Sequence, residues 1–114
     1  MQKQVKICNR QNIKGLNPED IIYFEACDGR VKAKLQHGVE ILCHGSLTNL
    51  EQHPSLKNFY RISRRYFIHS GKIASFELNT KKSFVTMKDG REIVIPARRK
   101  NAFLRQVRNQ FVIV

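Results

Sequence analysis

Alternation between apolar and polar residues is the feature that most constrains how this chain can fold. The clearest case is a pair of runs with apolar residues at every second position, namely Val31, Ala33, Leu35 and then Val39, Ile41, Cys43. Successive side chains of a strand point to opposite faces, so the pattern is typical of two strands with one buried face. Gln36-His37-Gly38 between the runs favours a tight turn. The region is therefore predicted to form a β-hairpin.

Two Asp-Gly pairs mark further turns. Asp89-Gly90 separates residues 83–87 from residues 92–95, and we expect both residues of the pair to take the positive φ values of a tight hairpin turn. Asp28-Gly29 is expected to join a strand over 21–26 to a strand that starts at Arg30. Additional strands are predicted around residues 5–7 and over 72–78, and a polar turn over 17–20.

Two segments break the alternation and are predicted to be helical. Ser46 is placed to cap a short helix over 46–52. The second helix spans 98–110, and the residues expected on its buried side are Ala102, Phe103, Gln106, Val107 and Gln110. The basic cluster at 98–100 would lie in its first turn, where the helix dipole disfavours cations. An anionic partner would relieve that cost, whereas the alternative is an ordinary solvated helix start.

The positive charge of the chain lies in its second half. The 114 residues carry a formal net charge of +12, but residues 1–53 have 7 basic and 6 acidic side chains whereas residues 54–114 have 14 and 3. A surface that is merely solubilising more often mixes the two signs. The asymmetry therefore favours a polyanionic partner, with nucleic acid ahead of an anionic membrane, because no long apolar run or amphipathic basic helix accompanies the charge.

Other function classes find little support. Clustered carboxylates for a metal-dependent nuclease, ligand-like histidine spacing for zinc and glycine-rich phosphate loops are all missing from the sequence. We therefore expect no enzyme activity, no metal and no cofactor. The chain begins without the apolar core of a signal peptide, so a cytoplasmic protein is expected. With 41% hydrophobic residues, residues 1–114 are expected to form one compact domain.

One basic segment is the strongest candidate for contact with a polyanion. Residues 59–73 read Phe-Tyr-Arg-Ile-Ser-Arg-Arg-Tyr-Phe-Ile-His-Ser-Gly-Lys-Ile. The apolar members are expected to anchor a short strand and turn in a core. Arg61, Arg64, Arg65 and Lys72 are expected to remain solvated and to face outward as a cationic edge.

Several motifs occur in an order that is more specific than any one of them. They are Asp20-Ile21-Ile22-Tyr23-Phe24-Glu25-Ala26, His44-Gly45-Ser46-Leu47 with Leu50-Glu51, the segment Phe59 to Ile68, Lys72-Ile73, Val85 to Gly90, and Ile95-Pro96-Ala97-Arg98-Arg99. This order resembles the LytTR family of bacterial DNA-binding domains over nearly the entire chain. The resemblance implies a mainly β, elongated antiparallel LytTR-type fold with small sheets and short helices. In this fold loops, rather than a recognition helix, enter successive major grooves.

The resemblance also implies site residues. The family's base-reading positions fall on Arg30, Arg64 and Arg98, and Gly29 or Lys32 is an alternative to Arg30 because the preceding loop is shorter than in some relatives. Arginine can bridge O6 and N7 of guanine, so a preference for guanine is a hypothesis. The flanking residues expected to bind phosphates are Ser63, Arg65, Arg99, Lys100 and Asn101.

The resemblance further implies a biological role. Such domains are output domains of response regulators in bacterial two-component systems, and they bind repeated sites in double-stranded promoter DNA, where two copies are expected. A receiver domain usually precedes them, and these 114 residues leave no room for one. The main alternative is a basic RNA-binding or ribosome-associated β domain, which exposed aromatic residues on one sheet face would favour.

Overall fold

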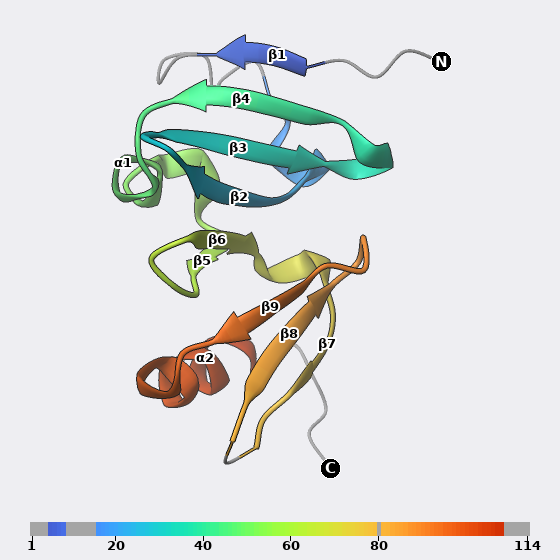
Figure 1. Ribbon diagram of the computed structural model, residues 1–114, viewed down its shortest axis with the longest axis vertical. Helices are drawn as coiled ribbons and strands as arrows, with labels where there is room; N and C mark the ends of the chain where they lie inside the picture. Colours follow the sequence, from blue (N-terminus) through green and yellow to red (C-terminus); the bar gives the residue numbers. More distant parts are fainter. Residues whose placement is uncertain (1–4, 9–15, 80, 109–114) are drawn as a thin grey trace.

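The structure, a computed structural model, describes residues 5–8, 16–79 and 81–108, and consists of two β-sheets with a short helix packed near each (Figure 1). Sheet A has six strands in the order β1-β4-β3-β2-β6-β5, and sheet B has three in the order β7-β8-β9. The two sheets lie one after the other along the longest axis of the molecule. The molecule measures 40 × 31 × 25 Å along its three principal axes. The prediction of an elongated, mainly β fold is confirmed.

The strand bounds follow the alternation in the sequence. Sheet A comprises β1 (Val5–Cys8), β2 (Ile21–Cys27), β3 (Arg30–Leu35), β4 (Glu40–His44), β5 (Phe59–Arg61) and β6 (Tyr66–His69). Sheet B comprises β7 (Ile73–Glu77), β8 (Ser83–Met87) and β9 (Glu92–Ile95). All described pairings are antiparallel except β1 with β4, which is parallel. The predicted hairpins are thus confirmed.

The two Asp-Gly turns differ in geometry. In the β2–β3 turn both Asp28 (φ 48°) and Gly29 (φ 77°) are left-handed, as a two-residue hairpin turn requires. In the β8–β9 turn only Gly90 has a positive φ, of 93°, so the prediction for Asp89 was wrong. The amide of Gly90 donates to the Met87 carbonyl. The loop is therefore one residue longer than the β2–β3 turn, and only Gly90 takes the left-handed conformation.

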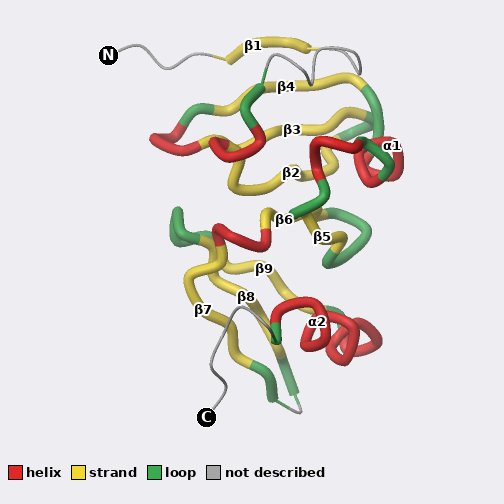
Figure 2. Tube along the Cα trace, turned by 180° about the vertical axis from the view of Figure 1, so that it is seen from behind, coloured by secondary structure: helices red, strands yellow, loops and turns green. Residues whose placement is uncertain are grey.

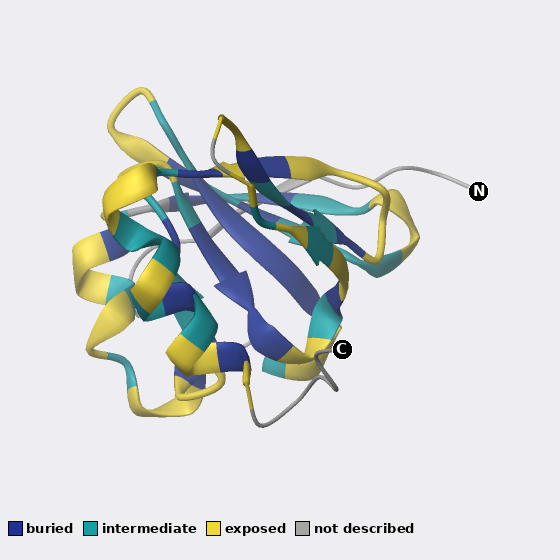
Figure 3. Cartoon of the chain, turned by 90° about the horizontal axis from the view of Figure 1, so that it is seen from below, coloured by how far each residue is buried: buried dark blue, intermediate teal, exposed yellow. Residues whose placement is uncertain are grey.

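Each face of sheet A contributes to a different core. One face packs Phe24, Phe59 and Phe67 together under α1 (Leu47–Glu51), while the opposite face of β2 and β6 packs against sheet B and α2 (Lys100–Val107). Figure 3 shows the buried strands in the centre and the exposed loops around them. The loops between strands are therefore held at the surface by cores on both sides.

Both predicted helices form, with shorter bounds. Ser46 caps α1 as predicted, because its Oγ accepts the amide hydrogen of Asn49 at 3.2 Å. In α2, Phe103 and Val107 are buried as expected, but Gln106 is exposed, so its placement on the buried side was wrong. Gln110 lies outside the described residues. Of the helices in the described parts of the chain, not one has the length and apolar character needed to span a bilayer.

His69 is a buried titratable group at the end of β6. Its ring packs on Phe59 with centroids 4.8 Å apart, and its Nδ1 accepts the Gly71 amide hydrogen at 2.9 Å. The neutral ring therefore carries its proton on Nε2, which lies 3.7 Å from the Glu19 carboxylate. Burial lowers the pKa of His69 below its ordinary value of 6.5, against the opposing effect of Glu19.

This shift predicts an acid-sensitive fold. As pH falls through about 6.5, the unfolded state binds a proton at residue 69 that the folded state does not bind, so the free energy of unfolding decreases. The slope from this one group is at most about 1.4 kcal/mol per pH unit, down to the folded pKa. Urea unfolding at pH 7.5 and at successively lower pH measures it. His69→Asn should flatten the curve, whereas His37→Asn, at an exposed turn, should leave it unchanged. A wild-type slope retained in His69→Asn would contradict the assignment.

Candidate nucleic-acid interface

Three loop regions that hold the predicted base-reading residues lie along one long side of the molecule. They are residues 26–30, which include the β2–β3 turn and Arg30, residues 61–65, which include the β5–β6 loop (62–65) and Arg64, and the segment 97–101 with Arg98. In Figure 1 all three face the left side, and Figure 2 shows the same side from behind. We call these three regions the contact edge, and Arg30, Arg64 and Arg98 the reading arginines. All three reading arginines are exposed.

A backbone hydrogen bond joins the first two regions. The amide of Ala26 donates to the Arg65 carbonyl at 2.8 Å, which extends the pairing of β2 with β6 beyond the last paired residues. Arg30 and Arg64 consequently line the same depression, of about 250 Å³, together with the start of α1. The structure therefore brings these two reading arginines into one neighbourhood, which sequence spacing alone does not show.

Arg61 shapes the β5–β6 loop from within. Its Nε donates to the Ser63 carbonyl at 2.7 Å, one terminal nitrogen donates to the Arg64 carbonyl at 3.0 Å, and the other bonds the Glu51 carboxylate on α1. Its side chain is 19% exposed. The prediction that Arg61 faces outward in solvent was wrong, because the loop carbonyls and Glu51 satisfy its donors. Arg64 and Arg65 are exposed as predicted, and Lys72 is half-buried.

The hydroxyl of Ser63 also stabilises the same loop. Its Oγ accepts the amide hydrogens of Arg65 and Tyr66, each at 3.2 Å. The hydroxyl proton is not used in these two bonds, so it can be donated to a phosphate oxygen. The geometry leaves the predicted phosphate contact of Ser63 available while giving the residue a structural role as well.

Cationic side chains of the third region, residues 97–101, form hydrogen bonds with neighbouring segments. A terminal nitrogen of Arg99 donates to the Arg61 carbonyl at 2.7 Å, and Lys100 Nζ donates to the Asn79 carbonyl at 2.7 Å. Arg98 precedes them in the 3-10 helix Ala97–Arg99 and is exposed, as is Asn101. Arg99 thus links this region to the end of β5, directly before the β5–β6 loop. A guanidinium has five donors, so Arg99 retains others for a ligand.

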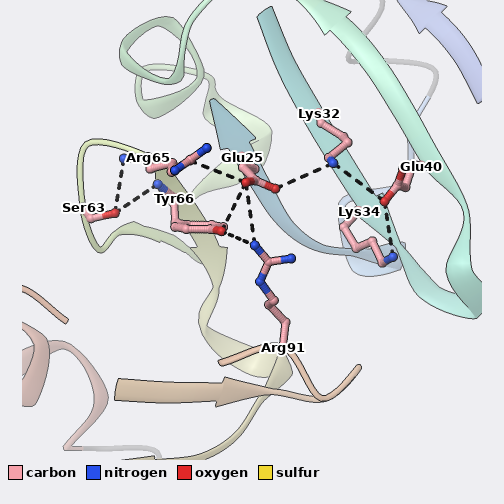
Figure 4. A network of polar contacts seen from close by, with 8 residues as sticks. All are labelled: Glu25, Lys32, Lys34, Glu40, Ser63, Arg65, Tyr66 and Arg91. Atoms are coloured by element: carbon pink, nitrogen blue, oxygen red, sulfur yellow. Dashed lines mark hydrogen bonds and ion pairs between the residues drawn. The ribbon is translucent and has the colours of Figure 1, made fainter. Parts of the chain in front are cut away.

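A nearly buried carboxylate lies behind the contact edge (Figure 4). Glu25, 7% exposed, accepts a hydrogen bond from the Tyr66 hydroxyl at 3.2 Å. Three cations surround it without hydrogen-bond geometry: Arg65 Nε at 3.6 Å, and Lys32 Nζ and a terminal nitrogen of Arg91 each at 3.8 Å. Arg91 also donates to the Tyr66 hydroxyl. Burial and then the Glu25 charge raise the pKa of Tyr66, so its hydroxyl stays protonated and donates.

Sequence reasoning identified the exposed arginines but missed the groups that position them. Glu25 and Glu51 were landmarks of the resemblance without an assigned role, and Arg61 was assigned to solvent. A signal was available for Glu25. It is the one charged residue in the run Ile21–Ala26, which otherwise consists of apolar and aromatic residues, and a charge in a buried run requires partners.

Comparisons with known proteins agree with this architecture. The family model of the LytTr DNA-binding domain matches residues 11–108. A solved LytTr DNA-binding domain, from a methyl-accepting/DNA response regulator of Bacillus cereus, superposes with a TM-score of 0.70 at 16% sequence identity, over 79% of this chain and 83% of that one. No curated protein matches the chain. The family model covers most of the sequence, and the chain therefore belongs to the LytTR family of DNA-binding domains.

Proposed function

We propose that this protein binds double-stranded promoter DNA in a sequence-specific manner, with the reading arginines in the major groove, and thereby regulates transcription. Ser63, Arg65, Arg99, Lys100 and Asn101 contact the phosphates on either side. Two copies occupy a repeated site, and a receiver domain controls them. The protein acts in the bacterial cytoplasm, without catalysis or cofactor.

The observation that carries this proposal is the alignment of three exposed arginines on one side, in regions that hydrogen bonds join to one another. Because Ala26 bonds Arg65 and Arg99 bonds Arg61, the three regions have fixed relative positions. Positioned guanidinium groups can read base edges through bidentate hydrogen bonds, whereas mobile cations only attract phosphates. Because these regions are held in position, they support sequence-specific reading of bases over attraction by charge alone.

The direct test is selection of bound sites from random duplexes, followed by binding measurements on the selected duplex. Arg64→Ala should lower affinity for that duplex by about 10- to 100-fold, the value of one bidentate contact, and affect a random duplex much less. The preference for guanine at one position of the site should weaken at the same time. Equal losses on both duplexes would contradict base reading by Arg64.

Lys88→Ala is a matched control, since it removes one exposed cation at the β8–β9 turn, on the opposite long side in Figure 1. It should change affinity for the selected duplex by less than about threefold, as expected for a charge outside the interface. Preference for single-stranded RNA over every duplex in the same competition assay would favour an RNA-binding domain instead. The aromatic residues of β5 and β6 on either side of the β5–β6 loop give that alternative little support, because Tyr60 and Tyr66 are half-buried against Phe103 and Tyr23.

A further inference from the structure

Glu25 is a nearly buried acidic group on β2, next to the contact edge. It lies next to Ala26, whose amide bonds the Arg65 carbonyl, and its carboxylate lies 3.6 Å from the Nε of Arg65. Arg65 is thus held to β2 through both its backbone and its side chain. Arg64, the adjacent reading arginine, has no comparable ion pair among the described residues.

The carboxylate of Glu25 is nearly buried among cationic side chains. Its side chain is 10% exposed and faces three cations from β3, the β5–β6 loop and the end of the β8–β9 turn. The Arg65 side chain is by contrast 68% exposed. A carboxylate in this position orients Arg65 without burying it, and it offsets part of the positive potential that a DNA phosphate meets at the β5–β6 loop.

We propose that Glu25 determines the specificity of the DNA contact by restraining Arg65 and so reducing sequence-independent attraction to phosphates. The inference rests on the proposed function. Non-specific binding depends almost entirely on phosphate contacts, so a free Arg65 would strengthen it. In the specific complex, base contacts fix the register, and an Arg65 already held in place meets its phosphate without further ordering.

Glu25→Gln tests this directly, because glutamine keeps the size and can still accept the Tyr66 hydrogen bond. Affinity for a random duplex should rise by about tenfold at 100 mM salt, with a salt slope steeper by about 0.9 for each additional phosphate contact. Affinity for the selected duplex should rise by less than about threefold. The ratio between the two affinities should therefore fall at least threefold. A purely structural role would not steepen the salt dependence.

Glu40→Gln is the matched control. Glu40 also pairs with Lys32, at 3.9 Å, and with Lys34, at 3.4 Å, so the substitution removes the same charge from the same sheet. It has no described contact with Arg65 and lies at the opposite end of β4 from the residue that pairs with Arg30. It should raise affinity for both duplexes slightly and equally. If Glu25→Gln gives the same result, Glu25 acts only through net charge and the proposal is overturned.

Arg65→Gln provides a second route in case Glu25→Gln is poorly folded. Arg65→Gln alone should weaken binding to the random duplex and reduce the salt slope by about 0.9. In the double variant with Glu25→Gln, it should abolish the effect of Glu25→Gln on the affinity ratio. An Arg65→Gln variant that leaves the slope unchanged overturns the proposal. A wild-type protein that shows no preference among duplexes overturns the proposed function itself, whereas a wild-type preference that Glu25→Gln leaves unchanged overturns only the role of Glu25.

Discussion

Raising the salt concentration from 50 to 200 mM should weaken binding to the selected duplex by about a thousandfold or more. In the proposed complex Arg65, Arg99 and Lys100 contact phosphates in each of two copies, which gives six cationic phosphate contacts in all. Each DNA charge that they neutralise releases condensed counterions, and six or more such contacts give losses of this size. Fluorescence anisotropy with labelled duplex over a salt series measures the slope.

Two variants identify which cations produce the salt effect. Lys88→Ala should leave the slope unchanged, because the β8–β9 turn that carries Lys88 lies on the opposite long side in Figure 1. Lys100→Ala, which removes one proposed phosphate contact, should reduce the slope by about 0.9 for each bound copy. Urea unfolding at both salt concentrations checks that the fold itself is not responsible. A nearly flat response of the wild-type protein would contradict binding through this edge.

Phe103→Ala should lower the free energy of unfolding by about 3 to 5 kcal/mol, which is a large part of the stability of a domain this size. Phe103 is fully buried, and its ring contacts Phe76 of β7 at 5.2 Å and Tyr60 of β5 at 6.3 Å between centroids. One side chain of α2 therefore packs against residues of both sheets. Urea or thermal unfolding of the purified variant gives the measurement.

The matched control for this substitution is Val94→Ala. Val94 is 53% exposed on β9, so truncation there removes little buried area and should cost less than about 0.5 kcal/mol. The position of α2 also predicts a second effect of Phe103→Ala. Since Arg98 to Asn101 lie at or just before the start of this helix, DNA affinity should fall even at temperatures where the variant is folded. Unchanged affinity would show that the segment 97–101 is positioned without Phe103.

Local patterns in the sequence were sufficient to predict most of the fold. Alternation located the hairpins, and Ser46 marked the start of α1 because a cap depends on residues only three positions apart. The prediction for Asp89 was wrong because Asp-Gly pairs fit more than one turn geometry, and the neighbouring strand register selects between them. Gln106 was assigned to the buried side because helical periodicity alone does not show how wide the covered face is.

Contacts between residues that are far apart in the sequence could not be predicted from local patterns. Arg61 was assigned to solvent because its partner Glu51 lies 10 positions away and its other acceptors are backbone carbonyls. The network of Glu25 with Tyr66 and Arg91 spans two sheets, and no local pattern predicts which cations will meet which carboxylate. The base-reading and phosphate-binding assignments stay predictions until the binding measurements are made.

The bond between Ala26 and Arg65 has a consequence for how this protein and its operator can change together. It is formed by main-chain atoms, so it is indifferent to which side chains stand at positions 30 and 64. In the proposed complex, substitutions at those positions alter the bases that are preferred but not the number of base pairs between them. A new operator could therefore arise by single side-chain replacements, with its spacing inherited unchanged from the pairing of β2 with β3 and β6.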